Sequence, residues 1–322
     1  MIHSFIYRKD KPFEIDVSRQ DLARAVWDKE AFVWVDLEDP TEFESETLIE
    51  IFNFHPLAVE DAINDLSQPK LDDYEEYLFL VMHGADYTTK DEFATMELDI
   101  FFNKNFVVTV HKKPMKSVSQ MREIITKKPS GYFHDGPEML VHAVLDRLVD
   151  NFNPLLNRYD EVLDQIEEKV LTETNGEFLK QILQLQKNVW LMRRLIGPQR
   201  DTMNQLSRNT TSFIKKKNLI YFRDVYDHLF QIYQTTEAFC EMLTGILQVH
   251  FSHASTKLNE VMKTLTVLAT MSLPSMVIAS IYGMNFKHMP ELSWEHGYWF
   301  ALSLMFLSST IVVIFMKIKK WF

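Results

Sequence analysis

"TLTVLATMSLPSMVIASIYGMNF", residues 264–286, runs for 23 residues without a charged side chain. As an α-helix this stretch would be roughly 34 Å long, enough to cross the hydrocarbon core of a bilayer. A second uncharged run, residues 297–316, has 20 residues and would be roughly 30 Å long. Two core helices of a soluble protein are the alternative. Two such runs back to back favour an integral membrane protein with two transmembrane helices.

Basic residues predict the orientation of these two spans. They flank the outer ends of the spans: Lys257, Lys263, Lys317, Lys319 and Lys320. The connecting segment holds Lys287 together with Glu291 and Glu295. Because lysine and arginine favour the cytoplasmic side, we expect a multi-pass protein of the cell (inner) membrane with both termini cytoplasmic.

The composition excludes several classes of protein. The 322 residues carry a net charge of −11, which argues against nucleic acid as the main partner, since phosphate binding needs a basic surface. The single cysteine, Cys240, excludes an intramolecular disulfide and a cysteine-rich metal site. The first sixteen residues, "MIHSFIYRKDKPFEID", lack the apolar region of a secretory signal.

The N-terminal part of the chain predicts a mixed α/β domain. Strands are expected at 4–8, 32–37, 77–87, 96–102 and 105–111, from their β-branched and aromatic content, and helices at 18–30, 41–52 and 56–65. From residue 138 the pattern becomes helical, with a hairpin around Asn175 and Gly176. Gly197 and Pro198 should kink or interrupt its second arm.

Residues 219–282 predict one helix about 96 Å long. Its apolar seam steps by three and four residues: Phe222, Val225, Leu229, Ile232, Thr236, Phe239, Leu243 and Ile246. The same steps then reach His250, His253 and Lys257. We therefore expect a stalk that packs along its first part and becomes polar toward the membrane.

No motif for an enzyme stands out. The one spacing that approaches a phosphate-binding loop, from Gly131 to Gly136, has Pro137 where the lysine should be. Two spans cannot enclose a water-filled path, so transport would require several chains around an axis. The hydroxyl and small residues of the first span either line that path or serve helix packing, and the residues leave both open: Thr264, Thr266, Thr270, Ser272, Ser275 and Ser280.

The end of the first span carries a Gly-Met-Asn tripeptide. Gly283 permits a turn away from the helix, and Asn285 offers a neutral carboxamide oxygen. Mg²⁺ loses its water reluctantly and prefers oxygen ligands, so a ring of carboxamides could hold the ion through its water shell. By itself, the tripeptide is also compatible with a simple helix cap.

In its context the tripeptide resembles the CorA family of magnesium and cobalt transporters. The resemblance rests on motifs spread over the chain: "HPLAVEDAIN" (55–64), "YFRDVYDH" (221–228), "NEVMKTLTVLAT" (259–270), "YGMNF" (282–286), "MPEL" (289–292) and "KIKKWF" (317–322). It implies a funnel-shaped homopentamer of an α+β cytosolic domain followed by long helices. The implied segments are a 1–133 α/β domain, 134–217 helical hairpin, 218–263 stalk, 264–286 first span, 287–296 external loop, 297–316 second span and 317–322 cytosolic tail.

The resemblance also implies roles for single residues. Gly283, Met284 and Asn285 would form the external selectivity filter. The pore and its hydrophobic gate would be lined by Asn259, Met262, Leu265, Ala269, Leu273, Met276 and Ser280, whose steps of three and four independently place them on one helical face. Asp224 would bind regulatory Mg²⁺ between subunits, with Asp86 and Asp91 as candidate partners. Ser280 stands where family members often have glycine, and Gln248 where an acid occurs.

We therefore expect a channel rather than an enzyme. It would take up Mg²⁺, with Co²⁺ or Ni²⁺ as further ions, driven by the membrane potential and closed by intracellular Mg²⁺. Its partners would be its own copies, membrane lipid and divalent cations, with no organic cofactor. A Zn²⁺ transporter of the same family and a membrane-anchored sensor without transport are the alternatives.

Overall fold

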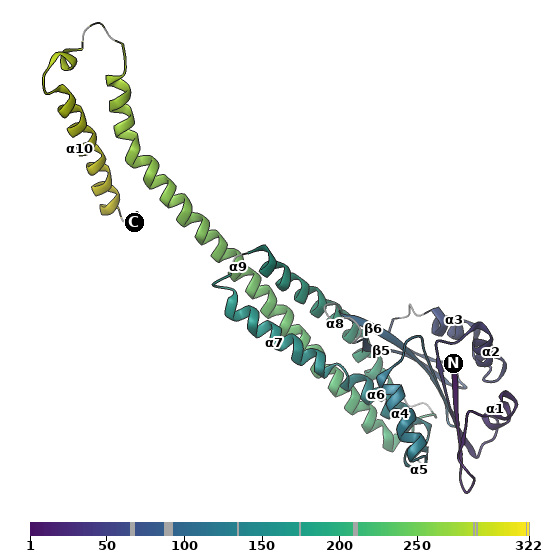
Figure 1. Cartoon of the computed structure of the whole chain (residues 1–322). Helices are drawn as coiled ribbons and strands as arrows, with labels where there is room; N and C mark the ends of the chain where they lie inside the picture. The colour runs from purple at the N-terminus through teal and green to yellow at the C-terminus, as the bar shows by residue number, and fades with distance from the viewer. Residues whose placement is uncertain are drawn as a thin grey trace. The chain divides into compact units, whose positions relative to one another are not determined.

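The computed structural model describes residues 1–64, 68–86, 93–133, 135–173, 175–208, 212–285, 287, 289–319 and 321 (Figure 1). The chain divides into two compact units. The first consists of Met1–Lys169 with Asn175–Ile246, and the second of Val170–Thr174 with Leu247–Phe322. Each unit is described by itself.

A seven-stranded sheet forms the centre of the first unit, in the order β2-β1-β3-β7-β6-β5-β4. Its strands are β1 (Ile2–Arg8), β2 (Glu14–Ile15), β3 (Ala31–Glu38), β4 (Lys70–Asp73), β5 (Leu78–Asp86), β6 (Ala94–Phe102) and β7 (Phe106–His111). The β3–β7 pair is parallel and the other pairs are antiparallel. A parallel pair needs a long crossover, and the chain between β3 and β7 supplies it.

Both faces of the sheet are covered. The helices α1 (Arg19–Val26), α2 (Glu42–Glu50) and α3 (Pro56–Asn64) lie on one side (Figure 1), over alternate strand residues such as Val35, Phe79 and Phe101. On the other side α6 (Pro137–Asp150) contacts β5, β6 and β7, and also packs on α4 (Lys116–Lys127). Strands buried on both faces read as nearly continuous apolar runs, which explains why the sequence predicts them.

The expected strands and N-terminal helices are confirmed within a few residues. The sequence missed β2, β4 and α4. The strand β4 reads "KLDD", with no β-branched or aromatic residue, and Met115 caps α4 without a side-chain hydrogen bond. The strand β4 therefore lacks the residue types that favour strands, and α4 lacks the capping residue that usually marks the start of a helix.

Further helical segments of the described residues belong to the first unit, and the last of them also enters the second. They are α5 (Ser130–Phe133), α7 (Asn153–Lys169), α8 (Gly176–Arg208), the short 3₁₀ helix η1 (Lys216–Asn218) and α9 (Leu219–Tyr282). The first arm of the hairpin is divided between α6 and α7, because Pro154 lacks an amide hydrogen and fits best in a first helical turn. Of the kink or interruption expected at Gly197–Pro198, the interruption is wrong. The helix α8 runs through Pro198, held by buried residues on both sides of it, Ile196 and Met203.

The predicted seam of α9 is confirmed. All eight of its positions from Phe222 to Ile246 are at most 7% exposed, so this face packs along its whole length. Beyond the seam His250 is buried, whereas Lys257 is exposed. In the second unit α9 continues to Tyr282, and after η2 (Pro290–Ser293) the helix α10 (Gly297–Ile318) follows. Both α9 and α10 contain a segment long and apolar enough to cross a membrane.

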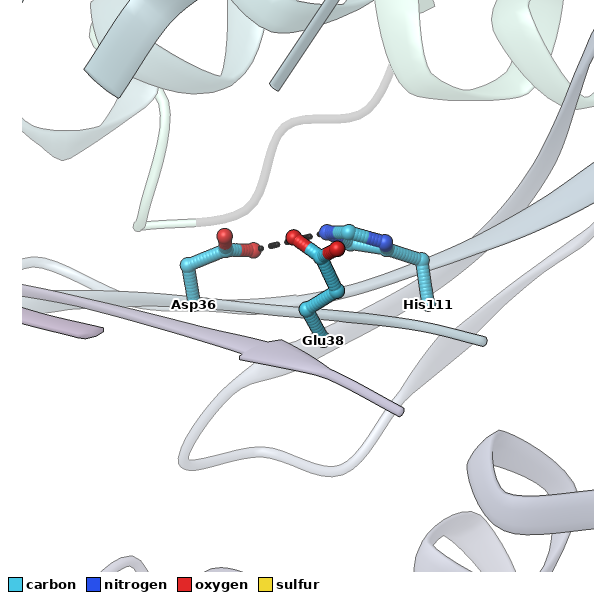
Figure 2. Close-up of side chains that lie close together, drawn as sticks. All are labelled: Asp36, Glu38 and His111. Atoms are coloured by element: carbon cyan, nitrogen blue, oxygen red, sulfur yellow. Dashed lines mark hydrogen bonds and ion pairs between the residues drawn. The ribbon is translucent and has the colours of Figure 1, made fainter. Parts of the chain in front are cut away.

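A cluster of charged side chains is buried between the sheet and α4. Asp36 and Glu38 on β3 and His111 on β7 point toward one another (Figure 2), with ligand atoms within 4.8 Å. Arg122 of α4 lies 3.4 Å from Asp36 Oδ2 and 3.0 Å from Glu38 Oε2. The side chains of Asp36 and His111 are fully buried.

The hydrogen bonds show that this cluster holds a proton. His111 Nδ1 lies 2.7 Å from the carbonyl of Lys113, which can only accept, so Nδ1 carries hydrogen. Nε2 lies 3.2 Å from Asp36 Oδ1, which also accepts from Thr109 Oγ1 at 2.6 Å. A charged imidazolium satisfies both partners. Two positive and two negative groups then balance, and a divalent cation would leave the cluster with excess positive charge.

The stability of the fold should therefore depend on the pH around His111. Burial opposes the charged ring, but the hydrogen bond and charge of Asp36 outweigh it and raise the pKa of His111. The stabilising contribution is complete below the unfolded pKa of about 6.5 and is lost as the pH rises through the folded pKa.

We expect His111→Gln to destabilise the protein by about 3 kcal/mol or more at pH 6, since it removes one partner of a buried pair. Thermal unfolding of the full-length protein in detergent measures this, and the deficit relative to wild type should shrink toward pH 9. The exposed His55 provides the control, His55→Gln. A deficit independent of pH would contradict the buried imidazolium.

Candidate functional site

The Gly-Met-Asn tripeptide follows directly on the end of α9. The amide of Gly283 donates to Ala279 O at 2.9 Å, which is still an α-helical bond to the fourth residue back. The amide of Met284 donates to Ile281 O at 3.2 Å, three residues back, so the α-helical hydrogen bonding ends here. The φ of Gly283 lies outside the left-handed region, so the glycine cap that would explain the tripeptide structurally is not formed. A Cβ at Gly283 would lie 3.2 Å from Ala279 O. Asn285 is exposed, with its carboxamide beyond the helix end.

The predicted pore-lining positions share a face of α9. All seven are exposed in the single chain: Asn259, Met262, Leu265, Ala269, Leu273, Met276 and Ser280. The helix α10 contacts α9 at Met271 and Ser275. At 3.6 residues per turn, the seven positions lie between about 80° and 200° around the axis from Ser275. They therefore point away from α10, and their role in lining a pore stays a prediction.

The hydroxyl groups of the first span are mostly turned to their own helix. Four of them donate to backbone carbonyls three or four residues earlier: Thr264, Thr266, Thr270 and Ser272. Ser275 instead lies 3.0 Å from Ser309 of α10. Because these hydroxyls already donate their protons to carbonyls of α9, the bonds favour a role in helix packing over a role in lining a path for most of them.

A second candidate site lies in the first unit, between α6 and α9. Asp146, Asp150 and His228 offer ligand atoms within 4.8 Å of one another, and none of the three is buried. His228 Nδ1 lies 3.9 Å from Asp146 Oδ1, and this nitrogen is buried without a hydrogen-bond partner among the described residues. The two carboxylates suit Mg²⁺, and carboxylate together with imidazole suits Co²⁺ and Ni²⁺. Unlike the Asp36 cluster, this one carries an excess of acids.

Asp224 belongs to the same electrostatic environment. It is exposed on α9, one turn before His228. Burial raises the pKa of Asp150, and the charges of Asp146 and Asp224 raise it further. Burial lowers the pKa of His142, against the attraction of Asp146 and Asp224. A cation bound here would relieve the repulsion among the acids.

The two candidate partners of Asp224 differ. The carboxylate of Asp86 is buried at the end of β5 and accepts from Lys113 Nζ at 3.0 Å, so a metal at Asp86 would have to displace that lysine. Asp91 lies outside the described residues.

Sequence reasoning missed Asp146, Asp150 and His228. One pattern could have found them. His142, Asp146 and Asp150 recur every fourth residue on α6, and Asp224 and His228 do so on α9, which places each set on one helix face. That the two faces meet is tertiary information.

Comparison with known proteins identifies the family to which this chain belongs. The family model of the CorA-like Mg²⁺ transporter protein matches residues 29–320. The chain is 37% identical to the cobalt/magnesium transport protein CorA of Thermotoga maritima, over 84% of this chain and 78% of that protein. It is 25% identical to the magnesium transport protein CorA of Helicobacter pylori J99, over 98% and 99%.

Solved structures agree on the fold. The CorA magnesium transporter of Methanocaldococcus jannaschii superposes with a TM-score of 0.87 over 100% of this chain and 99% of that one, at 23% identity. The ZntB cytoplasmic domain of Vibrio parahaemolyticus matches 79% of this chain and 98% of that one with a TM-score of 0.62, at 14% identity. The match of the family model over nearly the whole chain, with the two apolar C-terminal helices, shows that this chain belongs to the CorA-like Mg²⁺ transporter family.

Proposed function

We propose that this chain is the subunit of a homopentameric, funnel-shaped Mg²⁺ channel, with Co²⁺ and Ni²⁺ as further ions. The observation that carries the proposal is the exposed face of α9 that points away from α10, with Asn285 just beyond the end of the helix. Two spans per chain cannot enclose a path, so copies of α9 around an axis would supply it. The helix α10 then faces lipid, and both termini lie in the cytoplasm.

Asn285 is the residue that selects the ion. A neutral carboxamide accepts hydrogen bonds from the water shell of Mg²⁺ without replacing that shell. Binding then stays weak enough for the ion to leave. Deeper in the path, Met262, Leu265 and Leu273 would form an apolar constriction that closes when water leaves it.

The membrane potential is a sufficient driving force for uptake. A divalent cation moving through 100 mV gains about 4.6 kcal/mol, which sustains a gradient of roughly 2,000-fold. Nucleotide hydrolysis is not required, consistent with a sequence in which no phosphate-binding motif stands out.

Intracellular Mg²⁺ closes the channel through the acids of the first unit. Asp224, Asp146 and Asp150 repel one another when the site is empty, and burial together with the charges of Asp146 and Asp224 raises the pKa of Asp150. A bound cation removes the repulsion and favours the state in which these acids are close. Asp86 and Asp91 remain candidates for contacts between subunits. The Zn²⁺ alternative is supported by a likeness of fold alone.

Asn285→Ala should lower Mg²⁺ uptake into proteoliposomes by roughly tenfold or more, because the ring of oxygens at the pore mouth is lost. Ser293→Ala is the matched control, since Ser293 Oγ in the same loop donates locally to Pro290 O at 2.9 Å. Its uptake should stay near that of wild type. Wild-type uptake that Asn285→Ala leaves unchanged would refute the filter, and absence of any wild-type uptake would favour the sensor.

Asp224→Ala should raise the internal Mg²⁺ concentration for half-closure by about fivefold or more, the usual size of a coupling between sites. Asp227→Ala is the control, because Asp227 is an exposed acid of the same helix outside the cluster. Mg²⁺-dependent closure measured in both variants checks this. Equal shifts in the two variants would show a general effect of surface charge instead.

A further inference from the structure

The first span lacks one of the backbone hydrogen bonds of its helix. The helix α9 runs unbroken through Pro274, which has no amide hydrogen to donate to the carbonyl of Thr270. Within a membrane no water replaces the missing bond, so neighbouring helices or side chains must support such a turn. Sharp bends in helices occur at prolines.

A side chain from α10 reaches this turn. Ser309 Oγ donates to the carbonyl of Met271 at 3.2 Å. It also lies 3.0 Å from Ser275 Oγ. Since a hydroxyl has one proton and Ser309 gives its proton to the carbonyl, Ser275 is the donor between the two serines. The result is a chain of hydrogen bonds from Ser275 through Ser309 to Met271, across the turn that holds Pro274.

Ser309 differs from the hydroxyls beside it. Ser308 Oγ donates to Met305 O and Thr310 Oγ1 to Phe306 O, both within α10. Ser275 likewise differs from the hydroxyls before it in the span, which donate to carbonyls of α9. Of these described hydroxyls, the pair that joins the two helices is therefore the one beside the proline.

The location gives the pair a role in the path. Met271, Pro274 and Ser275 are half-buried on the side toward α10, while Leu273 and Met276 are exposed on the far side. A change of bend at Pro274 would move Leu273 and Met276 together. We propose that Ser309 is a positioning residue, which holds the proline turn of α9 against α10 and so sets the position of Leu273 in the apolar constriction and of the pore-lining Met276.

This inference rests on the proposed function for its effect on transport, but its structural part stands on the two helices alone. Hydrogen bonds between membrane helices shift equilibria by roughly threefold on average, equivalent to about 0.6 kcal/mol. Loss of the bond between Ser309 and Met271 should therefore shift the equilibrium between the held and the released turn at Pro274 by about that factor. A softer constriction closes less completely and leaks.

The test compares Ser309→Ala with Ser308→Ala in full-length protein, each also combined with Pro274→Ala. Hydrogen–deuterium exchange of the segment 271–278 measures the turn, and Mg²⁺ uptake at the internal Mg²⁺ concentration that closes wild type measures the leak. Ser309→Ala should raise both by roughly threefold, whereas Ser308→Ala should change neither. Ser309→Thr, which keeps the hydroxyl, should restore both.

The Pro274→Ala background separates a positioning role of Ser309 from a general effect on stability. With Pro274→Ala the backbone ladder is complete, so Ser309→Ala should no longer change exchange or leak. An undiminished effect in that background would overturn the proposal, as would equal effects of Ser309→Ala and Ser308→Ala. If wild type showed no uptake at all, the proposed function would fail, and the exchange arm alone would still decide the role of Ser309.

Discussion

The backbone of α9 must satisfy its own polar groups wherever it crosses the hydrocarbon core, and the design of the second unit depends on that constraint. A continuous helix meets it, and apart from the carbonyl of Thr270, which lacks its backbone donor at Pro274, the carbonyls inside the span are already used by the helix. Chemistry that recognises a cation is therefore confined to side chains or to the helix end. Asn285 lies at that end, directly after the last helical turn. At Pro274, where the ladder lacks a donor, a hydroxyl of α10 bonds the neighbouring carbonyl of Met271.

Among its described residues the first unit holds two clusters of acids and histidine that resemble each other in composition but not in charge. Around Asp36 the acids are matched by Arg122 and a charged His111, and the ring and carboxylate are fully buried. Around Asp146 three carboxylates face one permanently charged base, Arg147, beside His142 and His228, and Asp150 and Asp224 are exposed. A buried and balanced network stabilises the fold, and only an unbalanced, accessible one gains from a cation. Charge balance thus separates the two where ligand distances do not.

Most of the fold could be predicted from periodic patterns in the sequence. The seam from Phe222 to Ile246 could be predicted because burial on one helix face repeats every three or four residues. The continuity of α8 through Pro198 could not, because packing on both sides of the proline outweighs the loss of one hydrogen bond. The cluster of Asp146, Asp150 and His228 was missed for another reason. Its two acids repeat with the period of α6, but His228 on α9 is brought to them only by the contact between the two helices.

On the proposed function, the same ion is recognised twice with different ligands, and the difference follows from what each site must do. A pore mouth has to release its ion quickly, so a carboxamide that holds the water shell suits it and a fixed carboxylate would trap the ion. A sensor has to stay occupied until the internal concentration falls, and carboxylates that repel one another when empty provide both affinity and a change of state. Both sites involve α9, with Asp224 near its start and Asn285 just past its end. The amino acids at its two ends therefore differ because permeation and sensing place opposite demands on affinity.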